Sequence, residues 1–404
     1  MKVSIIGQGY VGLTVAQGAV SAGYQVIGYD IDSNLISELS IGKTHVPGIK
    51  MRILKEKMSD GSYLPTSNSN ELSNSDIFIL AVPTPLDNNH MPDLSYLISA
   101  SELVSRNVTK DCLVINESTS FPGTLRNLIK PIFDEIRVHE ILFSVAPERV
   151  DPGNVTWNLS NTPRVISGIS DEAVKKTIEF YSTFCESIYQ APSAEVAEAS
   201  KLFENTFRQV NIALANEFSL LSHKIGYSAH EALMAASTKP FGFMPFYPSI
   251  GVGGHCIPVD PVYLTKTSKN LGQDTPLIDK SIEINLTMHR KVVKRIQETL
   301  NHNLSGLKIQ IAGISYKSGV SDMRESPALQ LMEHLVNLGA IVSWHDPVVK
   351  KYNNVYSTEL GVNIDLGLIV TPHDQIDFSI WKSSRVNVLD ISSNSTDYGW
   401  PKFI

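Results

Sequence analysis

Short apolar runs alternate with amphipathic segments along the first half of the chain. The strand-like runs occupy residues 2–6, 25–30, 76–85, 112–119 and 141–150, and segments of helical character lie between them. This alternation is typical of buried parallel strands in βαβ units. We therefore expect an α/β domain with a parallel, doubly wound sheet, whose ligands bind at the carboxyl ends of the strands.

The middle of the chain follows a helical period instead. Residues 195–223 contain neither glycine nor proline, and their apolar positions recur at helical spacing, which predicts one long helix. Lys201, Asn205 and Arg208 lie four and three residues apart, so they share one face of this helix with Ile212. This polar stripe is either a solvated face or part of a functional site.

A second α/β pattern follows a helical region at residues 277–300. Strand-like runs begin at residue 307 and recur at 341–346, 366–372 and 386–392, without the glycine spacing of a dinucleotide-binding turn. The fold class that we expect is α/β, with two Rossmann-like doubly wound domains joined by a helical middle domain that contains the long central helix. We place the three domains at residues 1–190, 191–300 and 301–404.

A glycine pattern follows the first predicted strand. The sequence GQGYVG places Gly7, Gly9 and Gly12 in G-x-G-x-x-G spacing ahead of a helical run. The first glycine permits a tight turn, the second lets a pyrophosphate approach the backbone, and the third lets the helix pack on the strand. Asp30 ends the next strand, and a carboxylate there suits the ribose hydroxyls and repels a 2′-phosphate. The pattern predicts NAD as the cofactor, against the alternative that the glycines serve only helix packing.

The composition narrows the class of protein further. A chain of 404 residues with 42% hydrophobic residues has room for two or three domains. Its formal net charge of −7 disfavours a nucleic-acid binder. The apolar runs fall short of the roughly 20 residues that cross a bilayer. Because the N-terminus also enters a strand directly, we expect a cytoplasmic enzyme with no membrane or nucleic-acid partner.

The three cysteines do not have the spacing of a disulfide framework or of a metal site, so we expect reduced thiols and no metal. For Cys112, beside a strand, and Cys185, in a predicted helix, we expect small buried side chains. Cys256 differs because it lies in the glycine-rich stretch SIGVGGHCIPVDPVYL, with Asp260 close behind as a proton acceptor or orienting group. Small neighbours permit a ligand to approach, which makes this thiol a candidate nucleophile.

A dinucleotide site and a nucleophilic thiol together indicate a four-electron oxidation. NAD takes a hydride from an alcohol to give an aldehyde, and a thiolate that adds to the aldehyde makes a second hydride transfer feasible. Hydrolysis of the resulting thioester gives a carboxylate. Lys201 and Asn205 have the chemistry to stabilise the oxyanions of these steps, which favours the functional interpretation of the polar stripe.

Seven motifs spread over nearly the whole chain resemble the nucleotide-sugar 6-dehydrogenase family, which includes UDP-glucose, GDP-mannose and UDP-N-acetylhexosamine dehydrogenases. The motifs are GQGYVG, VPTPL, ESTSFPGT, APERVDPG, KLFENTFRQVNIALANE, KPFGFMPFYPSIGVGGHCIPVDP and SYKSGVSDMRESPA. Within the family, PERVDPG and ENTFRQVNIALANE resemble the branch that acts on UDP-N-acetylglucosamine or UDP-N-acetylmannosamine. The resemblance implies NAD-dependent oxidation of such a UDP-sugar at C6 to a uronic acid for surface polysaccharide synthesis.

The resemblance also implies catalytic roles for six residues. They are Cys256, Lys201, Asn205, Asp260, Thr119 and Glu148. The cysteine is the expected covalent nucleophile, and the aspartate is its general base or activating partner. The lysine and the asparagine stabilise oxyanions and position water, while the threonine and the glutamate hold a catalytic water near C6 of the sugar.

Ligand contacts follow from the same resemblance. Those expected for the cofactor are Gly7, Gly9, Tyr10, Val11, Gly12, Asp30, Thr84, Ser118 and Arg324. Those expected for the substrate are Arg149, Arg208, Phe246, Tyr247, Gly253 and Lys317, with the lysine at the nucleotide phosphates. The aromatic pair either stacks on uracil or packs against protein. The long helix is the expected core of a homodimer, alone or within a higher assembly.

Three departures from the family pattern leave the sugar open. PSIG, with Ser249 and Ile250, stands where much of this branch has PGPG and removes a glycine's backbone freedom. YKSG replaces the more usual FKPN, and Pro152 occupies the place of a second glutamate of the UDP-glucose branch. The alternatives are a UDP-glucose 6-dehydrogenase, a single hydride transfer that leaves Cys256 unused, and a catalytically silent nucleotide-sugar-binding protein.

Overall fold

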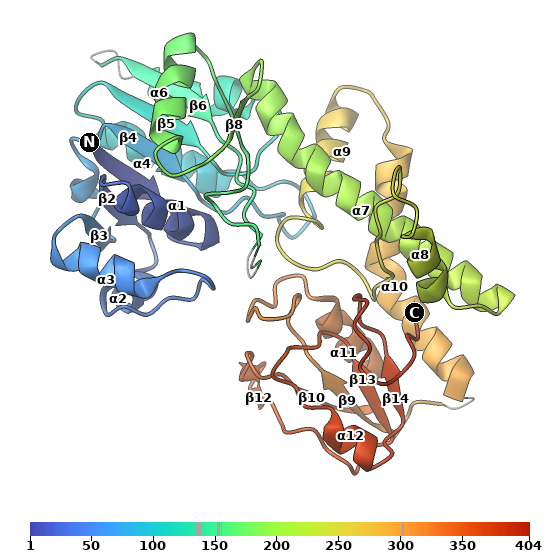
Figure 1. Ribbon diagram of the computed structural model, residues 1–404. Coiled ribbons are helices and arrows are strands. Elements are labelled where there is room, and N and C mark those ends of the chain that lie inside the picture. The colour runs from blue at the N-terminus through green and yellow to red at the C-terminus, as the bar shows by residue number, and fades with distance from the viewer. Residues whose placement is uncertain (135–138, 152–153, 155, 301–302) are drawn as a thin grey trace. The chain divides into compact units, whose positions relative to one another are not determined.

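The computed structural model describes residues 1–134, 139–151, 154, 156–300 and 303–404, so Pro152 lies outside the described residues. The chain forms two compact units (Figure 1). The first comprises Met1–Glu204 and Val262–Thr267, and the second comprises Asn205–Pro261 and Ser268–Ile404. Each unit contains its own β-sheet with helices. One helix of 32 residues, α7 (Ala194–Ile225), begins in the first unit and ends in the second unit. The expected fold class, two Rossmann-like sheets with a long central helix, is confirmed.

The first unit is built on an eight-stranded sheet in the order β3-β2-β1-β4-β5-β6-β7-β8. Its strands are β1 (Lys2–Ile6), β2 (Gln25–Tyr29), β3 (Tyr63–Thr66), β4 (Ile77–Leu80), β5 (Cys112–Asn116), β6 (Ile141–Val145), β7 (Arg164–Gly168) and β8 (Ile188–Gln190). Its helices are α1 (Tyr10–Ser21), α2 (Ser33–Ser40), α3 (Met51–Ser59), η1 (Ser69–Leu72), α4 (Ser95–Asn107), η2 (Leu125–Ile129), α5 (Lys130–Phe133) and α6 (Asp171–Tyr181). The first six strands follow the Rossmann order, which places a ligand crevice between β1 and β4.

The sheet of the first unit is not wholly parallel, which corrects the expectation from the sequence. Strand β7 pairs with β6 antiparallel through Ser144 and Gly168, and β8 then pairs with β7 parallel. A parallel crossover normally needs a helix. The described part of residues 146–163 contains none, so the chain returns along the neighbouring strand in the opposite direction.

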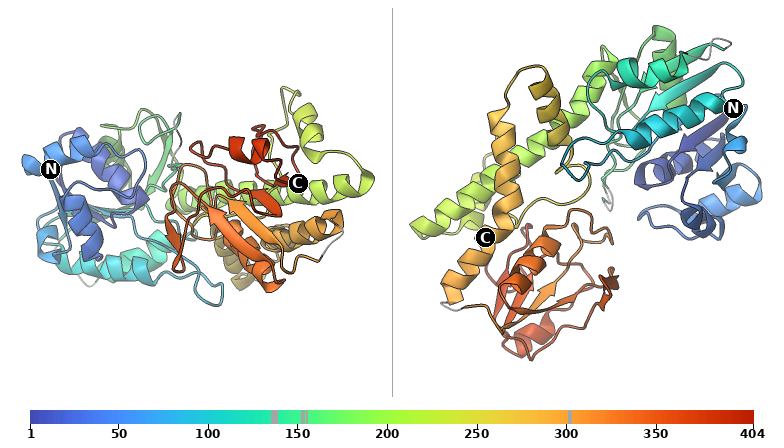
Figure 2. Two further views of the ribbon diagram at one scale, coloured as in Figure 1. Left: turned by 90° about the horizontal axis from the view of Figure 1, so that it is seen from below. Right: turned by 180° about the vertical axis from the view of Figure 1, so that it is seen from behind.

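Helices cover both faces of this sheet, as Figures 1 and 2 show. Helices α1, α3 and α6 contribute to one core, which includes Val3 and Ile5 of β1. Helices α4 and α5 contribute to the other core, which includes Ile6 from the same strand. Burial on both faces explains why these strands are continuous apolar runs.

The strands end earlier than the apolar runs of the sequence suggested. Strands β4, β5 and β6 end at Leu80, Asn116 and Val145, so the rest of each run forms a loop at the carboxyl edge of the sheet. Cys112 begins β5 and is buried. Cys185 is buried too, but it lies beyond the end of α6 rather than within a helix, because α6 ends at Tyr181.

The second unit contains a parallel sheet in the order β10-β9-β13-β14. Its strands are β9 (Lys308–Ala312), β10 (Ile341–His345), β13 (Leu366–Ile369) and β14 (Val388–Asp390), with an antiparallel pair of β11 (Lys351–Tyr352) and β12 (Val355–Tyr356). Its helices are α8 (Ala229–Ala236), α10 (Pro276–Leu300), α11 (Pro327–Asn337) and α12 (Ser379–Ser383). Helix α9 (Asp260–Asn270) begins and ends in this unit, whereas its middle, Val262–Thr267, belongs to the first. Helices α10 and α11 pack with β9 in a shared core. Among the described residues, no helix is both long and apolar enough to cross a membrane.

Candidate active site

The turn between β1 and α1 has the geometry that the glycine pattern predicts. Gly7 has φ +96°, and a Cβ there would lie 2.3 Å from the Ala81 carbonyl oxygen; a Cβ at Gly12 would lie 1.9 Å from the Gly7 carbonyl oxygen. Beside Gly9, by contrast, a Cβ would meet no atom within 4 Å. Helix α1 begins without a side-chain cap or an acidic residue in its first turn. Its backbone N–H groups are therefore suited to a pyrophosphate.

Asp30 lies directly after β2, beside this turn. Its Oδ2 accepts a hydrogen bond of 2.7 Å from the backbone N–H of Gln8, and its Oδ1 accepts one of 3.0 Å from that of Asp32. Behind the turn, the Tyr63 hydroxyl donates to Gln8 Oε1 at 2.8 Å, a contact that the sequence analysis missed. These bonds fix the carboxylate where it meets a ribose in this fold, so the residues present fit NAD.

Ser118 and Thr84 lie at the carboxyl ends of β5 and β4, where the sequence placed cofactor contacts. The buried Ser118 Oγ accepts a bond of 2.9 Å from the Val82 N–H and lies 2.9 Å from the Val82 carbonyl oxygen, to which it donates. The carbonyl of the buried Thr84 accepts from the Tyr263 hydroxyl at 3.2 Å. The Ser118 hydroxyl thus ties the two loops together, and Thr119 follows it, partly exposed.

A buried charged cluster lies directly behind these loops, and sequence reasoning missed it. Arg164 of β7 forms an ion pair with Glu117, the residue before Ser118, and donates to the Ala146 carbonyl at 3.0 Å. Its guanidinium also lies 4.3 Å from the centre of the Tyr181 ring, and the Tyr181 hydroxyl donates to Glu117. Burial by itself lowers the pKa of Arg164, but the surrounding acidic groups, Glu117 first, raise it above its ordinary value.

Glu148 and Arg149 follow β6, two residues beyond the carbonyl that Arg164 holds. Glu148 is buried and accepts the Val150 N–H. Arg149, an expected substrate contact, forms an ion pair with Glu204 and donates to the Pro163 carbonyl at 2.9 Å. Its guanidinium is therefore engaged within the first unit.

The start of α7 anchors the loop that contains Thr119. Glu198, which is buried, accepts bonds of 2.6 and 2.8 Å from the N–H groups of Gly123 and Leu125. Burial raises the pKa of Glu198 to about 7, against the lowering effect of these hydrogen bonds. Lys201 lies one turn further along the helix and is partly exposed. The catalytic candidates of the first unit are Thr119, Glu148 and Lys201.

The second unit holds the other catalytic candidates, Asn205, Cys256 and Asp260. Asn205 and Asp260 are buried, and Asn205 Nδ2 donates to Asp260 Oδ2 at 2.5 Å. Cys256 is exposed, and its carbonyl accepts the N–H of Asp260 at 2.9 Å, in the turn that leads into α9.

The glycines before Cys256 serve protein packing more than ligand approach. A Cβ at Gly253 would lie 2.8 Å from Tyr316 Cβ, and a Cβ at Gly254, where φ is +85°, would lie 2.9 Å from the Tyr316 ring. The Gly254 N–H also donates to the Arg324 carbonyl at 3.1 Å. The cysteine loop is therefore packed against the loops that follow β9.

The PSIG departure fits this backbone. Neither Ser249 nor Ile250 has a positive φ, whereas Gly251 has φ +148°. The buried Ser249 donates its N–H to Asn216 Oδ1 at 2.7 Å and its hydroxyl to the Gly251 carbonyl at 2.7 Å. No glycine is required at Ser249, the position where the branch has one.

Arg324, an expected cofactor contact, pairs with Asp322 in the second unit. Its Nε and Nη2 donate to the two carboxylate oxygens of Asp322 at 3.0 and 2.5 Å. His255, next to Cys256 and missed by the sequence analysis, lies near this pair. Burial, and then the Arg324 charge, lower the pKa of His255 to about 4.

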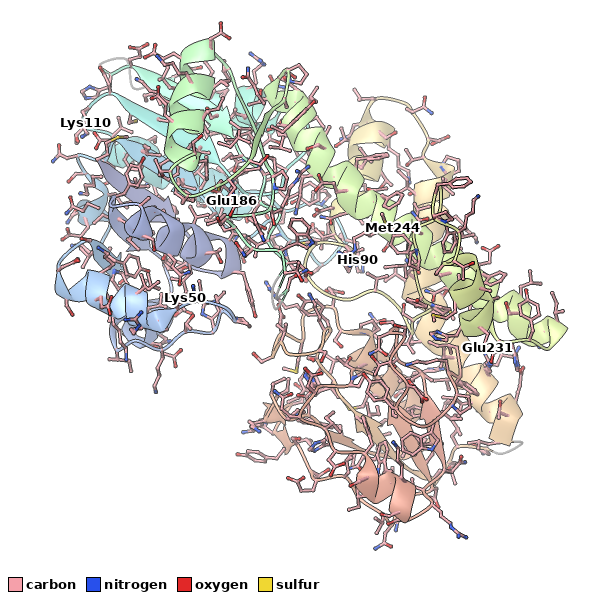
Figure 3. All side chains as sticks on the ribbon, viewed as in Figure 1. Lys50, His90, Lys110, Glu186, Glu231 and Met244 are labelled. Atoms are coloured by element: carbon pink, nitrogen blue, oxygen red, sulfur yellow. The ribbon has the colours of Figure 1, made fainter. Side chains whose placement is uncertain are left out.

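The remaining substrate candidates lie in the second unit as well. The ring of Phe246 packs against Phe207 with centroids 5.7 Å apart, and that of Tyr247 lies 5.2 Å from His230, so both aromatic residues contact protein. Arg208 is exposed on α7. Residues 241–245 before the pair are exposed, including Met244 (Figure 3). Gly253 and Lys317 lie in the cysteine loop and in the loop after β9.

The fold and site define an NAD-binding α/β dehydrogenase. Family models of the UDP-glucose/GDP-mannose dehydrogenase family match three successive segments: the NAD binding domain at residues 1–189, the central domain at 195–287 and the UDP binding domain at 310–391. The chain belongs to this family, as its motifs indicated, and it is an NAD-dependent oxidoreductase.

Individual relatives are similar over almost the whole chain. UDP-N-acetyl-D-mannosamine dehydrogenase of Pyrococcus horikoshii is 38% identical over 95% of this chain and 92% of the relative. UDP-N-acetyl-D-glucosamine 6-dehydrogenase of Pseudomonas aeruginosa is 34% identical over 86% of this chain and 83% of the relative. Among solved structures, the UDP-D-ManNAc dehydrogenase of P. horikoshii superimposes with a TM-score of 0.88 at 35% identity, covering 99% of this chain and 98% of that one.

Proposed function

We propose that this chain oxidises C6 of a UDP-N-acetylhexosamine, UDP-N-acetylmannosamine or UDP-N-acetylglucosamine, to a uronic acid through covalent catalysis by Cys256. The observation that supports this most is the exposed thiol in a turn that leads into α9, with the buried Asn205–Asp260 pair in the same unit. NAD, when bound at the β1–α1 turn, supplies the hydride acceptor. The product is of the kind that surface polysaccharide synthesis consumes.

The residues divide the chemistry between them. The Cys256 thiolate adds to the C6 aldehyde and forms a carbon–sulfur bond, while Asp260 receives the thiol proton directly or through water. Lys201 and Asn205 stabilise the negative charge on the C6 oxygen. The resulting thiohemiacetal becomes a thioester by losing a second hydride, for which NAD would be the acceptor. A water held by Thr119 and Glu148 then hydrolyses the thioester, which returns the thiol and releases the carboxylate.

The stoichiometry of the reaction tests this mechanism. We expect two NADH for each UDP-sugar consumed. Cys256→Ser should lower kcat by several orders of magnitude while UDP-sugar binding persists, because a hydroxyl adds poorly to the aldehyde. One NADH per sugar would instead indicate simple alcohol oxidation, and none would indicate a binding protein.

The sugar is best identified by direct comparison of substrates. Relatives named for N-acetylhexosamine substrates reach 38% identity, and this supports that class. A structure of a UDP-glucose dehydrogenase from Pyrobaculum islandicum has a TM-score of 0.87 but 24% identity, so it bears on the fold alone. We expect the highest kcat/KM with an N-acetylated UDP-sugar when four are assayed together: UDP-GlcNAc, UDP-ManNAc, UDP-glucose and UDP-galactose. A preference for UDP-glucose would favour the alternative.

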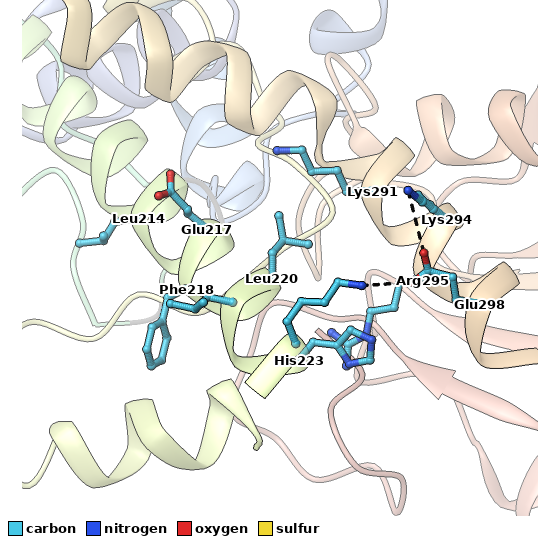
Figure 4. Close-up of a pocket in the computed structure, with 11 residues that line it drawn as sticks. Leu214, Glu217, Phe218, Leu220, His223, Lys291, Lys294, Arg295 and Glu298 are labelled. Carbon is cyan, nitrogen blue, oxygen red and sulfur yellow. Dashed lines mark ion pairs between the residues drawn. The ribbon is translucent and has the colours of Figure 1, made fainter. Parts of the chain in front are cut away.

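The exposed apolar face of α7 supports a homodimer. Phe207, Leu214 and Leu221 recur every seven residues on one face of the helix and are 41%, 67% and 54% exposed. Beside them, a cavity of about 630 Å³ lies between α7 and α10 and is rimmed by charged groups, including the pair of Lys294 with Glu298 at 4.0 Å (Figure 4). Exposed apolar surface of this kind marks protein interfaces. A second copy is the occupant that we propose.

Light scattering tests the dimer. A double substitution, Leu214→Glu with Leu221→Glu, should convert the dimer to a monomer, because two charges would be buried in the interface. Val336→Glu is the matched control, since Val336 is a similarly exposed apolar residue on α11. A monomeric wild-type chain would refute the proposal. Reduced thiols are typical of a reducing compartment, which we propose is the cytoplasm.

A further inference from the structure

The turn after β9 in the second unit repeats the geometry of the NAD-binding turn. The Gly313 N–H donates to the carbonyl of His345, the last residue of β10, at 2.8 Å, as the Gly7 N–H does to that of Tyr29. A Cβ at Gly313 would lie 1.8 Å from the Thr371 carbonyl oxygen, so the turn abuts the chain that leaves β13. Strands β9 and β13 are neighbours at the point where the strand order reverses, which is where such sheets bind ligands.

Asp346 occupies the position in this sheet that Asp30 occupies in the first. Each is the residue after the neighbouring strand, and Asp346 Oδ2 accepts the Ile314 N–H at 2.9 Å as Asp30 Oδ2 accepts the Gln8 N–H. Asp30 is partly exposed, whereas Asp346 is only 1% exposed. Its Oδ2 also lies 3.2 Å from His373 Nε2. At the position where the first sheet has Asp30, the proposed ribose contact, the second sheet thus has an aspartate that is buried against a histidine.

The hydrogen bonds of His373 fix the place of its proton. The Gly319 backbone N–H, which can only donate, points to His373 Nδ1 at 3.0 Å, so Nδ1 accepts. The ring proton therefore lies on Nε2, between Asp346 Oδ2 and Ser315 Oγ, which is 3.1 Å away. Ser315 is free to accept because its own hydrogen goes to the Lys317 carbonyl at 3.0 Å. A ring that accepts at Nδ1 and donates at Nε2 satisfies every one of these contacts.

These contacts hold the loop of residues 315–319 at both ends. Thr371 Oγ1 donates to the Ser315 carbonyl at 2.7 Å at one end, and His373 holds Gly319, with φ +76°, at the other. Between them lie Tyr316, against which Gly253 and Gly254 of the cysteine loop pack, and Lys317. The buried histidine therefore holds one end of a loop that contains Lys317, the proposed phosphate contact, and packs against the cysteine loop.

We propose that His373 is a positioning residue for the UDP-sugar: with Asp346 behind it, it holds the 315–319 loop in the conformation that binds the nucleotide diphosphate. Asp346 contacts the histidine and not a ribose. This Rossmann-like sheet therefore binds a nucleoside diphosphate through its loop. The inference rests on the proposed function and deepens it.

Two substitutions separate the two sides of the ring. In His373→Asn the side-chain oxygen can replace Nδ1 and accept the Gly319 N–H, whereas in His373→Gln the amide nitrogen can replace Nε2 and donate to Asp346. Both remove one hydrogen bond of a buried side chain, so both should lower the melting temperature to a similar extent. Only His373→Gln releases the loop.

Isothermal titration with UDP, and KM for the UDP-sugar, measure the consequence. We expect His373→Gln to weaken UDP binding and to raise KM about tenfold, which corresponds to ~1.4 kcal/mol, and His373→Asn to stay within about twofold of the wild type. NAD affinity should be unchanged in both. Equal UDP affinities in the two variants would overturn the proposal. Failure of the wild type to bind UDP or to oxidise a UDP-sugar would refute the proposed function itself.

Gly319 supplies a second test that does not touch the core. It is exposed, and a Cβ there would meet no atom within 4 Å. Gly319→Val disfavours the positive φ and moves the N–H away from His373, whereas Gly319→Asn tolerates it. UDP binding should weaken about tenfold in the valine variant and little in the asparagine variant. Wild-type affinity in both variants would contradict a role for the His373 contact.

Discussion

Replacement of Arg164 by methionine tests the buried cluster behind the cofactor-side loops. The arginine is 4% exposed and bonds to both Glu117 and the Ala146 carbonyl. Methionine keeps much of the volume but leaves Glu117, 1% exposed, without its cationic partner. The Tyr181 hydroxyl remains as one hydrogen-bond donor to that carboxylate. The perturbation is therefore an uncompensated acid in the interior of the first unit.

The expected cost follows from the burial of both partners. Removing one partner of a buried ion pair typically costs about 3–5 kcal/mol. A domain of this size changes its melting temperature by roughly 2–4 °C for each kcal/mol, so the variant should melt about 6–20 °C lower. Adding Glu117→Leu removes the stranded carboxylate and should restore at least about 2 kcal/mol of the lost stability. Recovery stays partial because Tyr181 and the Ala146 carbonyl lose their partners.

This double-mutant cycle is measured by urea unfolding and thermal scans. The four proteins compared are the wild type, both single variants and the double variant. A loss below about 1 kcal/mol in Arg164→Met would show that the pair contributes little to holding the two loops. A double variant as unstable as the sum of the single variants would show that the two side chains are not coupled. Either result would refute the reasoning.

Three further predictions concern the cofactor turn, the buried glutamate and the PSIG departure. Gly9→Ala should leave the melting temperature unchanged, because φ at Gly9 is −73° and a Cβ there has open space. It should weaken NAD binding at least tenfold, measured by titration, because the Cβ would stand where the pyrophosphate approaches the backbone. Unchanged affinity would contradict the NAD site. The raised pKa of Glu198 means that the native state binds this proton more tightly than the unfolded chain, so the free energy of unfolding falls as pH rises from about 4.5 to about 7. Glu198→Gln should remove up to about 3 kcal/mol of this pH dependence, measured by unfolding across that pH range. An unchanged dependence of the unfolding free energy on pH would contradict the prediction. Ser249→Gly should cost about 1 kcal/mol in stability by losing its hydroxyl bond to Gly251, with no gain in kcat/KM; a clear gain would show that the loop needs glycine freedom there.

Local patterns were enough to predict the elements and the cofactor turn. The absence of glycine and proline predicted a helix at residues 195–223, and the structure has one at Ala194–Ile225. The glycine spacing predicted the β1–α1 turn because the whole pattern lies within residues 7–12 of the sequence, although the atom that a Cβ at Gly7 would meet belongs to the distant Ala81. Such features depend on neighbours in the chain.

Features that depend on partners distant in the sequence were not predictable. The antiparallel course of β7 results from a connection without a described helix, which strand-like sequence does not reveal. Glu117 and Arg164 are 47 residues apart, and Asp346 and His373 are 27 apart; nothing local marks either pair. The signals that would have raised the question are an arginine directly before an apolar run, as at Arg164, and a histidine shortly after one, as at His373. The packing of Gly253 on Tyr316 has no local signal at all.

The covalent role of Cys256 is tested most directly by mass spectrometry of enzyme quenched during turnover. Glu148→Gln should slow hydrolysis of the thioester without preventing its formation, since the glutamate acts on the water. With NAD and an N-acetylated UDP-sugar, we expect the peptide that contains Cys256 to carry the mass of the oxidised UDP-sugar, and Cys256→Ser to abolish it. Two NADH per sugar with this peptide unmodified at every time point would contradict the covalent mechanism.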